Sequence, residues 1–326
     1  GLGLFIALIG LIDSKVVRQG GTPLELGLGG SLQGWPTLVF MFGLFLTLIL
    51  MVRKVRGAIL IGILSSTVLA VIIEAVAHLG AFNAEKNKTG WSLAVPHLNG
   101  SPFAMPSFET LGKFSLLGSI DKVGIVSVVL LVFTLLLADF FDTMGTMIAV
   151  GAEGDLLDSE GNPPKTREIL VVDSLAAIAG GVGGVSSNTS YIESATGVGE
   201  GARTGLASVV TGCMFFLSMF IAPLVSMVPY EAATPALVIV GFLMMTQVAE
   251  IDWTDLEIAI PSFLTIAMMP FSYSITNGIG AGFLSYVVLA VARGKVKQIH
   301  PLMWLTAVLF LVYFTLAPIK AILGVS

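Results

Sequence analysis

Two stretches decide the fold of this chain: ADFFDTMGTM at residues 138–147 and GGVGGVSSNTSYIESATGVGEGART at residues 180–204. Both interrupt sequence that is otherwise apolar, and they place the carboxylates of Asp139, Asp142 and Glu193 in or beside segments hydrophobic enough to lie in lipid. An unpaired charge in the middle of a membrane helix costs at least about 2.5 to 3.5 kcal/mol. We therefore expect a compensating partner, with a buried polar substrate or a bound proton as the leading candidate.

The composition is that of an integral membrane protein. The chain has 326 residues, of which 55% are hydrophobic and 11% are charged, and its mean hydropathy is +0.95. A soluble domain usually carries about 25% charged residues. The net charge is -5 and no basic block is long enough to follow a phosphate backbone, so we expect no nucleic-acid partner. One cysteine, Cys213, allows no disulfide within the chain.

Apolar runs of about 20 residues, the length that crosses the hydrocarbon layer, predict about ten membrane spans. The runs are continuous rather than alternating, which favours helices over a β-barrel. The first run starts without Met, so we expect the chain to begin inside a longer protein. The runs cover residues 2–12, 35–51, 58–77, 125–150, 169–179, 206–228, 235–248, 258–273, 279–291 and 301–316.

Short basic loops predict the orientation in the membrane. Basic residues gather at 53–56, between two runs, and at 293–297, after another. Positive charge in short loops favours the cytoplasmic side. Alternation across the membrane then places the long connection 79–120 outside and the polar loop 151–167 inside.

The acidic stretch predicts a polar stripe on one helix. Asp139, Asp142, Thr143 and Thr146 are spaced at i, i+3, i+4 and i+7, which places all four on one face. Two carboxylates one turn apart raise each other's proton affinity, and partial burial adds to that effect. The stripe therefore indicates a protonatable group facing a cavity. The alternative is that Asp142 only caps or cross-links helices.

Residues 180–191 predict a break in a membrane span. Four of the first five residues are glycines, and Ser, Asn and Thr follow, a composition that favours irregular or extended backbone over helix. Such backbone is tolerated at membrane depth where it lines a cavity. A helix can restart near 191–193, with its positive amino-terminal end facing that cavity. Glu193 in that first turn is either a site residue or a structural amino-terminal charge.

Several other chemistries are disfavoured. The glycine-rich stretch lacks the GxxxxGK[ST] pattern and a nearby lysine, which disfavours nucleotide hydrolysis. The three histidines, His78, His97 and His300, are scattered, so we expect no metal and no cofactor. No Ser/His/Asp order stands out, and we expect no enzyme.

The motifs resemble a known family. ADFFDTMGT at 138–146, SNTSYIESATGVGEGARTG at 187–205 and PALVIVGFLMM at 235–245 are similar to the azaguanine-like purine permeases of the nucleobase:cation symporter-2 family. The resemblance extends over essentially the whole chain. It implies an all-α polytopic fold of fourteen spans in two inverted seven-span repeats, with a short broken strand-helix span, and it implies that this chain starts in the fifth span.

The resemblance also implies roles for particular residues. Asp139 and Glu193 match the substrate-binding carboxylates of the family, and backbone amides of the broken span complete the site. Asp142 and Thr143 lie where related permeases place a group linked to proton coupling. The implied substrate-binding residues are Asp139, Glu193, Ser190, Tyr191 and Ile192, and the implied proton-coupling residues are Asp142 and Thr143.

A division into gate and core domains follows from the resemblance. The facing half of the pocket is expected upstream of Gly1, in the third span. The expected parts are gate-domain spans at 1–78, an extracytoplasmic connection at 79–120, core-domain spans at 121–229, further gate-domain spans at 230–293 and a carboxy-terminal accessory helix at 294–326.

The function implied is a proton-coupled symporter that imports purine nucleobases through the plasma membrane by an elevator-like, alternating-access cycle. Carboxylates shielded from water accept the N–H groups of a purine strongly. Sodium is the other possible coupling ion, and the family suggests a homodimer formed through gate helices. Alternatives are an anion transporter of the sulfate-permease type, which would prefer a neutral or basic lining, a membrane channel, and an intramembrane protease, for which two acids on one helix face are not opposed.

Overall fold

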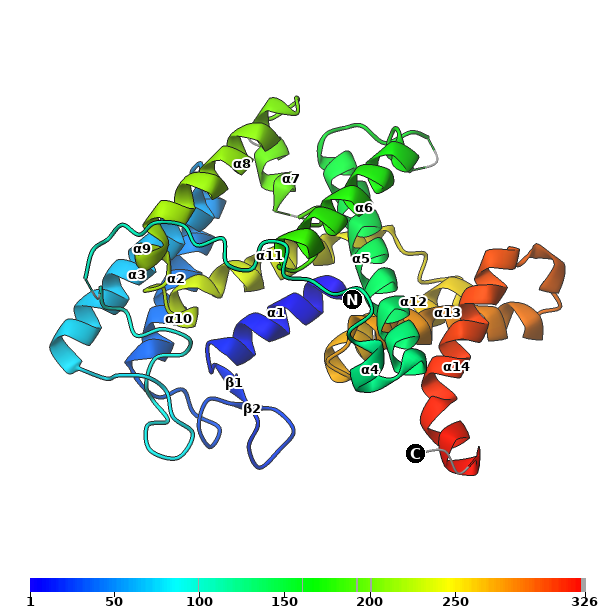
Figure 1. Ribbon diagram of the computed structural model, residues 1–326, viewed down its shortest axis with the longest axis horizontal. Coiled ribbons are helices and arrows are strands. Elements are labelled where there is room, and N and C mark those ends of the chain that lie inside the picture. Colours follow the sequence, from blue (N-terminus) through cyan, green and yellow to red (C-terminus); the bar gives the residue numbers. More distant parts are fainter. Residues whose placement is uncertain (99, 160, 192, 200, 324–326) are drawn as a thin grey trace. The chain divides into compact units, whose positions relative to one another are not determined.

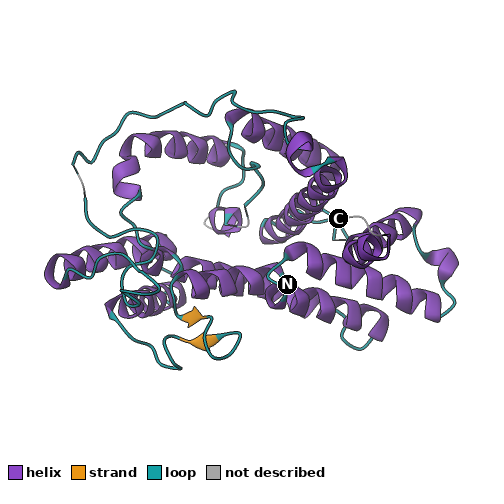
Figure 2. Cartoon of the chain, turned by 60° about the horizontal axis from the view of Figure 1, so that its bottom comes forward, coloured by secondary structure: helices purple, strands orange, loops and turns teal. Residues whose placement is uncertain are grey.

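The structure of the protein is a computed structural model that describes residues 1–98, 100–159, 161–191, 193–199 and 201–323. The described residues are mostly helical (Figure 1, Figure 2). Their only strands form a two-stranded antiparallel pair, β1 (Val17–Arg18) and β2 (Glu25–Leu26). The predicted all-α class is confirmed.

The longer helices overlap the predicted apolar runs, and short helices lie between them. The helices are α1 (Leu2–Asp13), α2 (Trp35–Val52), α3 (Ala58–Ala77), α4 (Ile120–Val123), α5 (Ile125–Glu153), α6 (Thr166–Gly183), α7 (Ser194–Gly199), α8 (Leu206–Ser218), α9 (Ala222–Val225), α10 (Tyr230–Ala233), α11 (Pro235–Met245), α12 (Leu256–Phe271), α13 (Ile275–Ala292) and α14 (Pro301–Leu323). Short 3-10 turns lie at Met219–Ile221, Thr246–Glu250 and Val296–Gln298.

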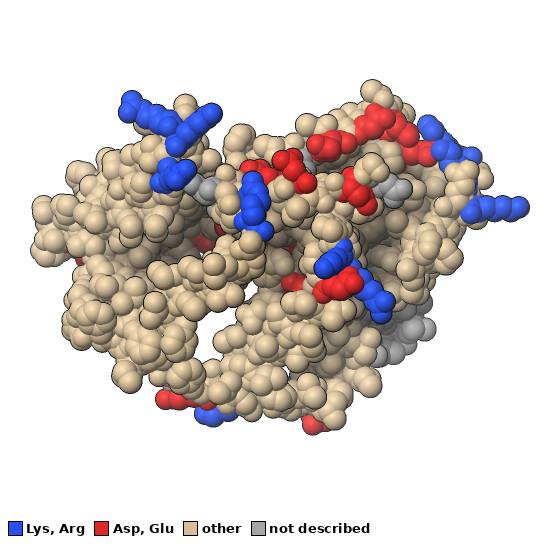
Figure 3. Space-filling model, turned by 90° about the horizontal axis from the view of Figure 1, so that it is seen from above, with Lys and Arg blue, Asp and Glu red and all other residues tan. Residues whose placement is uncertain are grey.

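Six helical segments of the described chain are long and apolar enough to cross a membrane. They are Trp35–Val52, Ala58–Ala77, Ser127–Glu153, Leu206–Val225, Tyr230–Glu250 and Ile275–Ala292, and α1, α12 and the first part of α14 are shorter apolar helices. On the face drawn in Figure 3, charged side chains cover a minor part of the surface. An apolar surface of this extent is suited to lipid. The count of ten spans and the inverted repeats stay predictions.

The chain folds into two compact units that each combine distant segments. Unit 1 contains residues 1–5, 110–192 and 244–326, and unit 2 contains residues 6–109 and 193–243. The units divide the chain at other positions than the expected gate and core domains, and those domains stay a prediction.

Unit 2 is built around α2, α3 and α10, with part of the long connection packed on them. Trp91 is 1% exposed and joins Val39, Ala70 and Ala232 in one apolar cluster. Its indole Nε1 donates to Glu74 Oε2 over 2.8 Å. The connection is therefore anchored at Trp91, because a buried indole N–H needs an acceptor.

A second anchor lies one residue further along. The backbone N–H of Ser92 donates to the carboxylate of Glu231, 3.1 Å from Oε1. Glu231 is fully buried at the start of α10. Because a buried carboxylate without a donor would be costly, this bond fixes residues 91–92 against α10.

Unit 1 contains the α12–α13 hairpin. Asp255 caps α12 by accepting the backbone N–H of Glu257 over 2.9 Å, and Ser274 caps α13 by accepting that of Asn277 over 3.2 Å. Such caps satisfy amide groups that the helix itself leaves without acceptors. The two helices approach closely at Gly282, where a Cβ would collide with the Thr265 side chain.

Candidate functional site

Helix α5 carries the polar stripe predicted from the spacing. The helix runs unbroken through Asp139, Asp142, Thr143 and Thr146, so the four residues share one face. Thr143 and Thr146 are buried, and the two carboxylates are half-buried. Thr146 Oγ1 is buried without a hydrogen-bond partner among the described residues. The stripe therefore presents polar atoms to the interior of unit 1.

The break follows the glycines, but it starts later than expected. We predicted irregular backbone from residue 180, whereas α6 continues to Gly183 and Gly184 caps its carboxy-terminal end. Gly184 has φ +69°, and its backbone N–H bonds back to the carbonyls of Gly180 and Gly181. A left-handed glycine is a common carboxy-terminal cap. The glycines thus end the helix rather than prevent it.

Gly180 also lets the broken segment turn back across α6. A Cβ on Gly180 would collide with the carbonyl oxygen of Ser186 and would lie 3.3 Å from the backbone nitrogen of Asn188. Gly180 is buried, and the Asn188 side chain donates to the carbonyl of Ala176 over 3.2 Å. Residues 185–190 therefore lie directly on α6, which only a residue without a side chain permits.

Asp173 on α6 is the centre of the resulting polar cluster. It is buried, and its Oδ1 accepts the backbone N–H of Ser190 over 3.1 Å and the Ser190 hydroxyl over 3.2 Å. Its Oδ2 accepts the hydroxyl of Thr143 over 2.8 Å. Three donors on one buried carboxylate offset its desolvation. Asp173 therefore holds the broken segment against α5 and α6 together.

The direction of the hydrogen bonds follows from the carboxylate. The hydroxyls of Thr143 and Thr189 are 2.8 Å apart. An ionised carboxylate only accepts, so the single proton of the Thr143 hydroxyl is directed to Asp173. Thr189 must then donate to Thr143. A directed chain runs from the broken segment through α5 to α6.

Asp139 also contacts the broken segment, at Ser187, which precedes Ser190 in the chain. Ser187 donates its hydroxyl to Asp139 Oδ1 over 3.0 Å. Ser187 is exposed and Asp139 is half-buried, whereas Asp173 is buried. Asp139 Oδ2 has room to accept another donor, because a carboxylate offers about four lone-pair positions.

The structure brings together some of the predicted site residues. Thr143 and Ser190 meet at Asp173, and Tyr191 is 60% exposed just beyond them. Ile192 lies outside the described residues. Glu193 directly precedes α7, which begins at Ser194, so the prediction that Glu193 lies in the first turn was one residue early. Asp139 belongs to unit 1 and Glu193 to unit 2, and their pairing stays a prediction.

Sequence reasoning missed Asp173. The signal was present, because Asp173 is a single acid in the apolar run ILVVDSLAAIA at 169–179. The cost of a charge in lipid applies to Asp173 as much as to Asp139. Within the described part of the chain, no cluster of three or more His, Cys, Asp or Glu is arranged to hold a metal ion.

These features define a class of protein. Six helical segments of the described chain are long and apolar enough to cross a membrane, and within unit 1 an ordered polar cluster joins an unbroken helix to a broken segment. In membrane proteins, irregular backbone beside buried acids marks a path or a binding site for a polar solute. The class is that of polytopic membrane transporters.

Comparison with known families identifies the group. Residues 1–316 match the model of a family described as the permease family. The chain belongs to this family, and the resemblance seen in the sequence is confirmed. Permeases are transporters rather than enzymes, and the chain is a multi-pass protein of the plasma membrane.

The relatives of this chain are similar over almost all of its residues. The adenine permease AdeP of Escherichia coli (strain K12) is 38% identical over 312 residues, which are 95% of this chain and 64% of the relative. The guanine/hypoxanthine permease PbuG of Bacillus subtilis (strain 168) is 36% identical over 314 residues, which are 96% of this chain and 66% of the relative. The chain thus spans slightly less than two thirds of the length of these curated relatives.

Proposed function

We propose that this chain is part of a proton-coupled symporter that imports purine nucleobases of the adenine, guanine and hypoxanthine class. The relatives are named as adenine and guanine/hypoxanthine permeases. The observation that carries the proposal is the polar cluster at Asp173, which fixes the segment 187–190 beside the stripe of α5. The family relationship and the cluster together support a site for a small polar solute.

The proposed site uses carboxylates for the base and backbone groups for its orientation. Asp139 and Glu193 accept N–H groups of the purine, and Ser190, Tyr191 and Ile192 offer main-chain groups. Charge-assisted hydrogen bonds are about twice as strong as neutral ones. The Asp139 carboxylate has one bond to Ser187, which orients it and leaves the other oxygen for substrate.

Proton coupling is assigned to Asp142 and Thr143 on α5. Asp142 lies one turn from Asp139 on the same face. An acid inside a membrane span is costly when it is charged, and a bound proton removes that charge. A proton carried on this helix face together with the base would link the two transport events.

The proposed cycle moves core spans against gate spans. The core spans are residues 121–229, the gate spans are 1–78 and 230–293, and the intact protein is proposed to act as a homodimer. Helix-rich transporters commonly alternate access by movement of one bundle around a fixed site.

Uptake of radiolabelled adenine and hypoxanthine by cells that express the intact protein tests the site. We expect Asp139→Asn to reduce uptake strongly, while Asp121→Asn, a matched change on the exposed helix α4, leaves it near the wild-type level. Uptake by Asp139→Asn that equals the wild type would remove Asp139 from the site.

The coupling ion has a separate test. We expect a protonophore to abolish accumulation of the base, and replacement of sodium by choline to leave accumulation unchanged. Accumulation that requires sodium and resists the protonophore would assign the coupling to sodium. Equilibration without accumulation would support a channel.

A further inference from the structure

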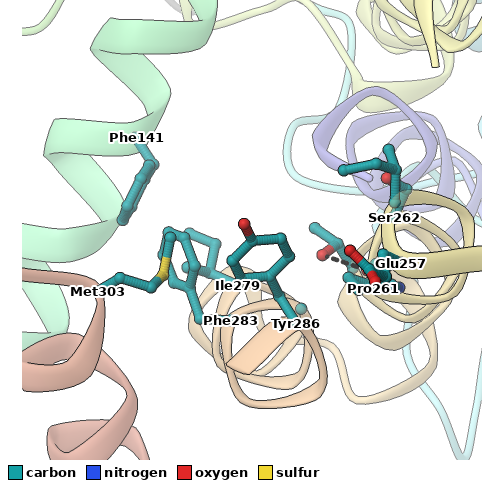
Figure 4. Close-up of a pocket in the computed structure, with 11 residues that line it drawn as sticks. Phe141, Glu257, Pro261, Ser262, Ile279, Phe283, Tyr286 and Met303 are labelled. Carbon is teal, nitrogen blue, oxygen red and sulfur yellow. Dashed lines mark hydrogen bonds between the residues drawn. The ribbon is translucent and has the colours of Figure 1, made fainter. Parts of the chain in front are cut away.

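Unit 1 contains a cleft that is separate from the polar cluster. The cleft has a volume of about 320 Å³ and lies between α5, α12, α13 and α14 (Figure 4). Its walls are mostly apolar and include Phe141, Ile258, Pro261, Ile279, Phe283 and Met303. A volume of this size is at the lower end of the range of about 300–1,000 Å³ for small-ligand sites.

Aromatic rings in tilted contact support one wall of the cleft. The ring of Phe283 lies 5.2 Å from that of Phe141 and 6.2 Å from that of Phe310. Phe310 is fully buried behind it. Aromatic side chains in such contacts lose little further freedom when a ligand binds, so the wall is preformed.

The cleft has a charged end at Glu257. Its Oε2 lies 2.7 Å from the Lys295 ammonium, and its Oε1 lies 2.8 Å from Arg293 Nη1. The side chains of Arg293 and Lys295 remain 52% and 40% exposed. The carboxylates of Glu257 and of Asp255, which caps the same turn of α12, balance the two cations, and both cations have further N–H groups to offer an anion.

A neutral polar group lies inside the cleft. In Figure 4 the hydroxyl of Tyr286 is directed into the space that the other labelled side chains surround. Tyr286 is half-buried on α13. A phenol in this position can donate to a carbonyl oxygen of a bound molecule.

We propose that the cleft binds one glycerophospholipid with an anionic headgroup from the cytoplasmic leaflet. One acyl chain lies between Phe141 and Met303, the Tyr286 hydroxyl donates to an ester carbonyl, and the headgroup phosphate contacts Arg293 and Lys295. Basic residues at the ends of spans favour the cytoplasmic side, where anionic lipids also concentrate. This inference does not depend on the transported substrate.

We expect the headgroup, rather than the acyl chain, to decide which lipid the cleft prefers. A lipid tail in the cleft exchanges one apolar environment for another, so the tail contributes little to preference. Each Lys or Arg near an anionic surface contributes about 1 kcal/mol. A purine base fits this cleft poorly, because Glu257, the carboxylate in its lining, is already paired with two cations.

Native mass spectrometry of the intact purified protein tests the proposal. The probes are dioleoyl phosphatidylglycerol and dioleoyl phosphatidylcholine, which share acyl chains and differ in headgroup. We expect more phosphatidylglycerol adducts on the wild type. We expect Arg293→Gln, which keeps the Glu257–Lys295 pair, to lower this preference about fivefold. The matched control Arg53→Gln removes an exposed arginine from the other basic loop and should leave the preference unchanged.

Two further variants test the cleft while all the ion pairs stay in place. Ser262→Phe places a ring in the cleft and should lower the adducts of both lipids, and Tyr286→Phe should weaken both without changing the headgroup preference. Thermal unfolding checks that each variant is folded. Equal adducts of both lipids on the wild type, or an equal loss in Arg53→Gln, would overturn the proposal. Retention of glycerol 3-phosphate without a tail, or a changed oligomeric mass of Ser262→Phe at unchanged lipid binding, would also overturn it.

Discussion

The hydroxyl of Thr143 on α5 lies 2.8 Å from a carboxylate oxygen of Asp173 on α6. This contact joins two helices that are separated in sequence by a polar loop, and Ser190 of the broken segment bonds to the same carboxylate. Three pieces of chain therefore share one buried acid. The position of the segment that precedes Glu193 depends on this acid.

We predict that Asp173→Asn weakens both the fold and transport. The amide replaces one acceptor oxygen by a donor, which then faces either Thr143 or Ser190. A buried group left without its partner costs about 1–3 kcal/mol. We expect lower thermal stability in detergent and reduced nucleobase uptake. The control Asp155→Asn changes an exposed acid in the loop after α5 and should behave as the wild type. Normal uptake by Asp173→Asn would show that the cluster is not needed for transport.

Two adjacent glycines provide a matched pair of variants. Gly180→Ala would place a methyl group on the carbonyl of Ser186, whereas Gly181→Ala meets no atom within 4 Å. Alanine is more favourable than glycine inside a helix by about 1 kcal/mol. We therefore expect Gly181→Ala to keep or raise stability and to retain uptake. Gly180→Ala should displace the broken segment and reduce uptake, and similar uptake by both variants would contradict this.

Stability should depend on pH through the ion pairs of Glu257. This residue precedes the apolar part of α12, and the hydrogen bond from the Lys295 ammonium lowers the pKa of its carboxyl below the ordinary value of 4.5. A lowered folded-state pKa stabilises the protein above the unfolded pKa, and the contribution is lost as the pH falls through the folded-state pKa. The melting temperature of the wild type should therefore exceed that of Glu257→Gln at neutral pH, and the gap should shrink as the pH falls below 4.5. An unchanged gap would mean that charge on Glu257 does not matter. As a matched control, Glu85→Gln changes an exposed acid and should show no gap.

The anchor of the long connection can be tested at Trp91. Trp91→Ala removes a fully buried side chain and its bond to Glu74. Removal of a large buried aromatic side chain costs about 3–5 kcal/mol. We expect a clear loss of thermal stability, while Trp35→Ala, at a side chain that is half exposed at the start of α2, should cost much less. Equal losses would argue against a specific role of the Trp91 cluster.

Much of the local structure could be predicted from the sequence. The apolar runs gave the helices, and the spacing of Asp139, Asp142, Thr143 and Thr146 gave a polar stripe, because both depend on the period of one helix. The family followed from the motifs at residues 138–146, 187–205 and 235–245. The end of α6 was missed by a few residues, because glycine can both weaken a helix and cap it.

What the sequence alone determined is the membrane class, the order of the apolar helices and the acids that need partners. The tertiary structure decided which partners they have: Asp173 with Thr143 and Ser190, and Glu257 with Arg293 and Lys295. It also distinguished two adjacent glycines. A Cβ on Gly180 would collide with the returning segment, whereas a Cβ on Gly181 would meet no atom within 4 Å. The physical reason is that the helical period and the cost of a charged residue in lipid can be read from local sequence. A contact between two helices depends instead on how segments far apart in the chain pack.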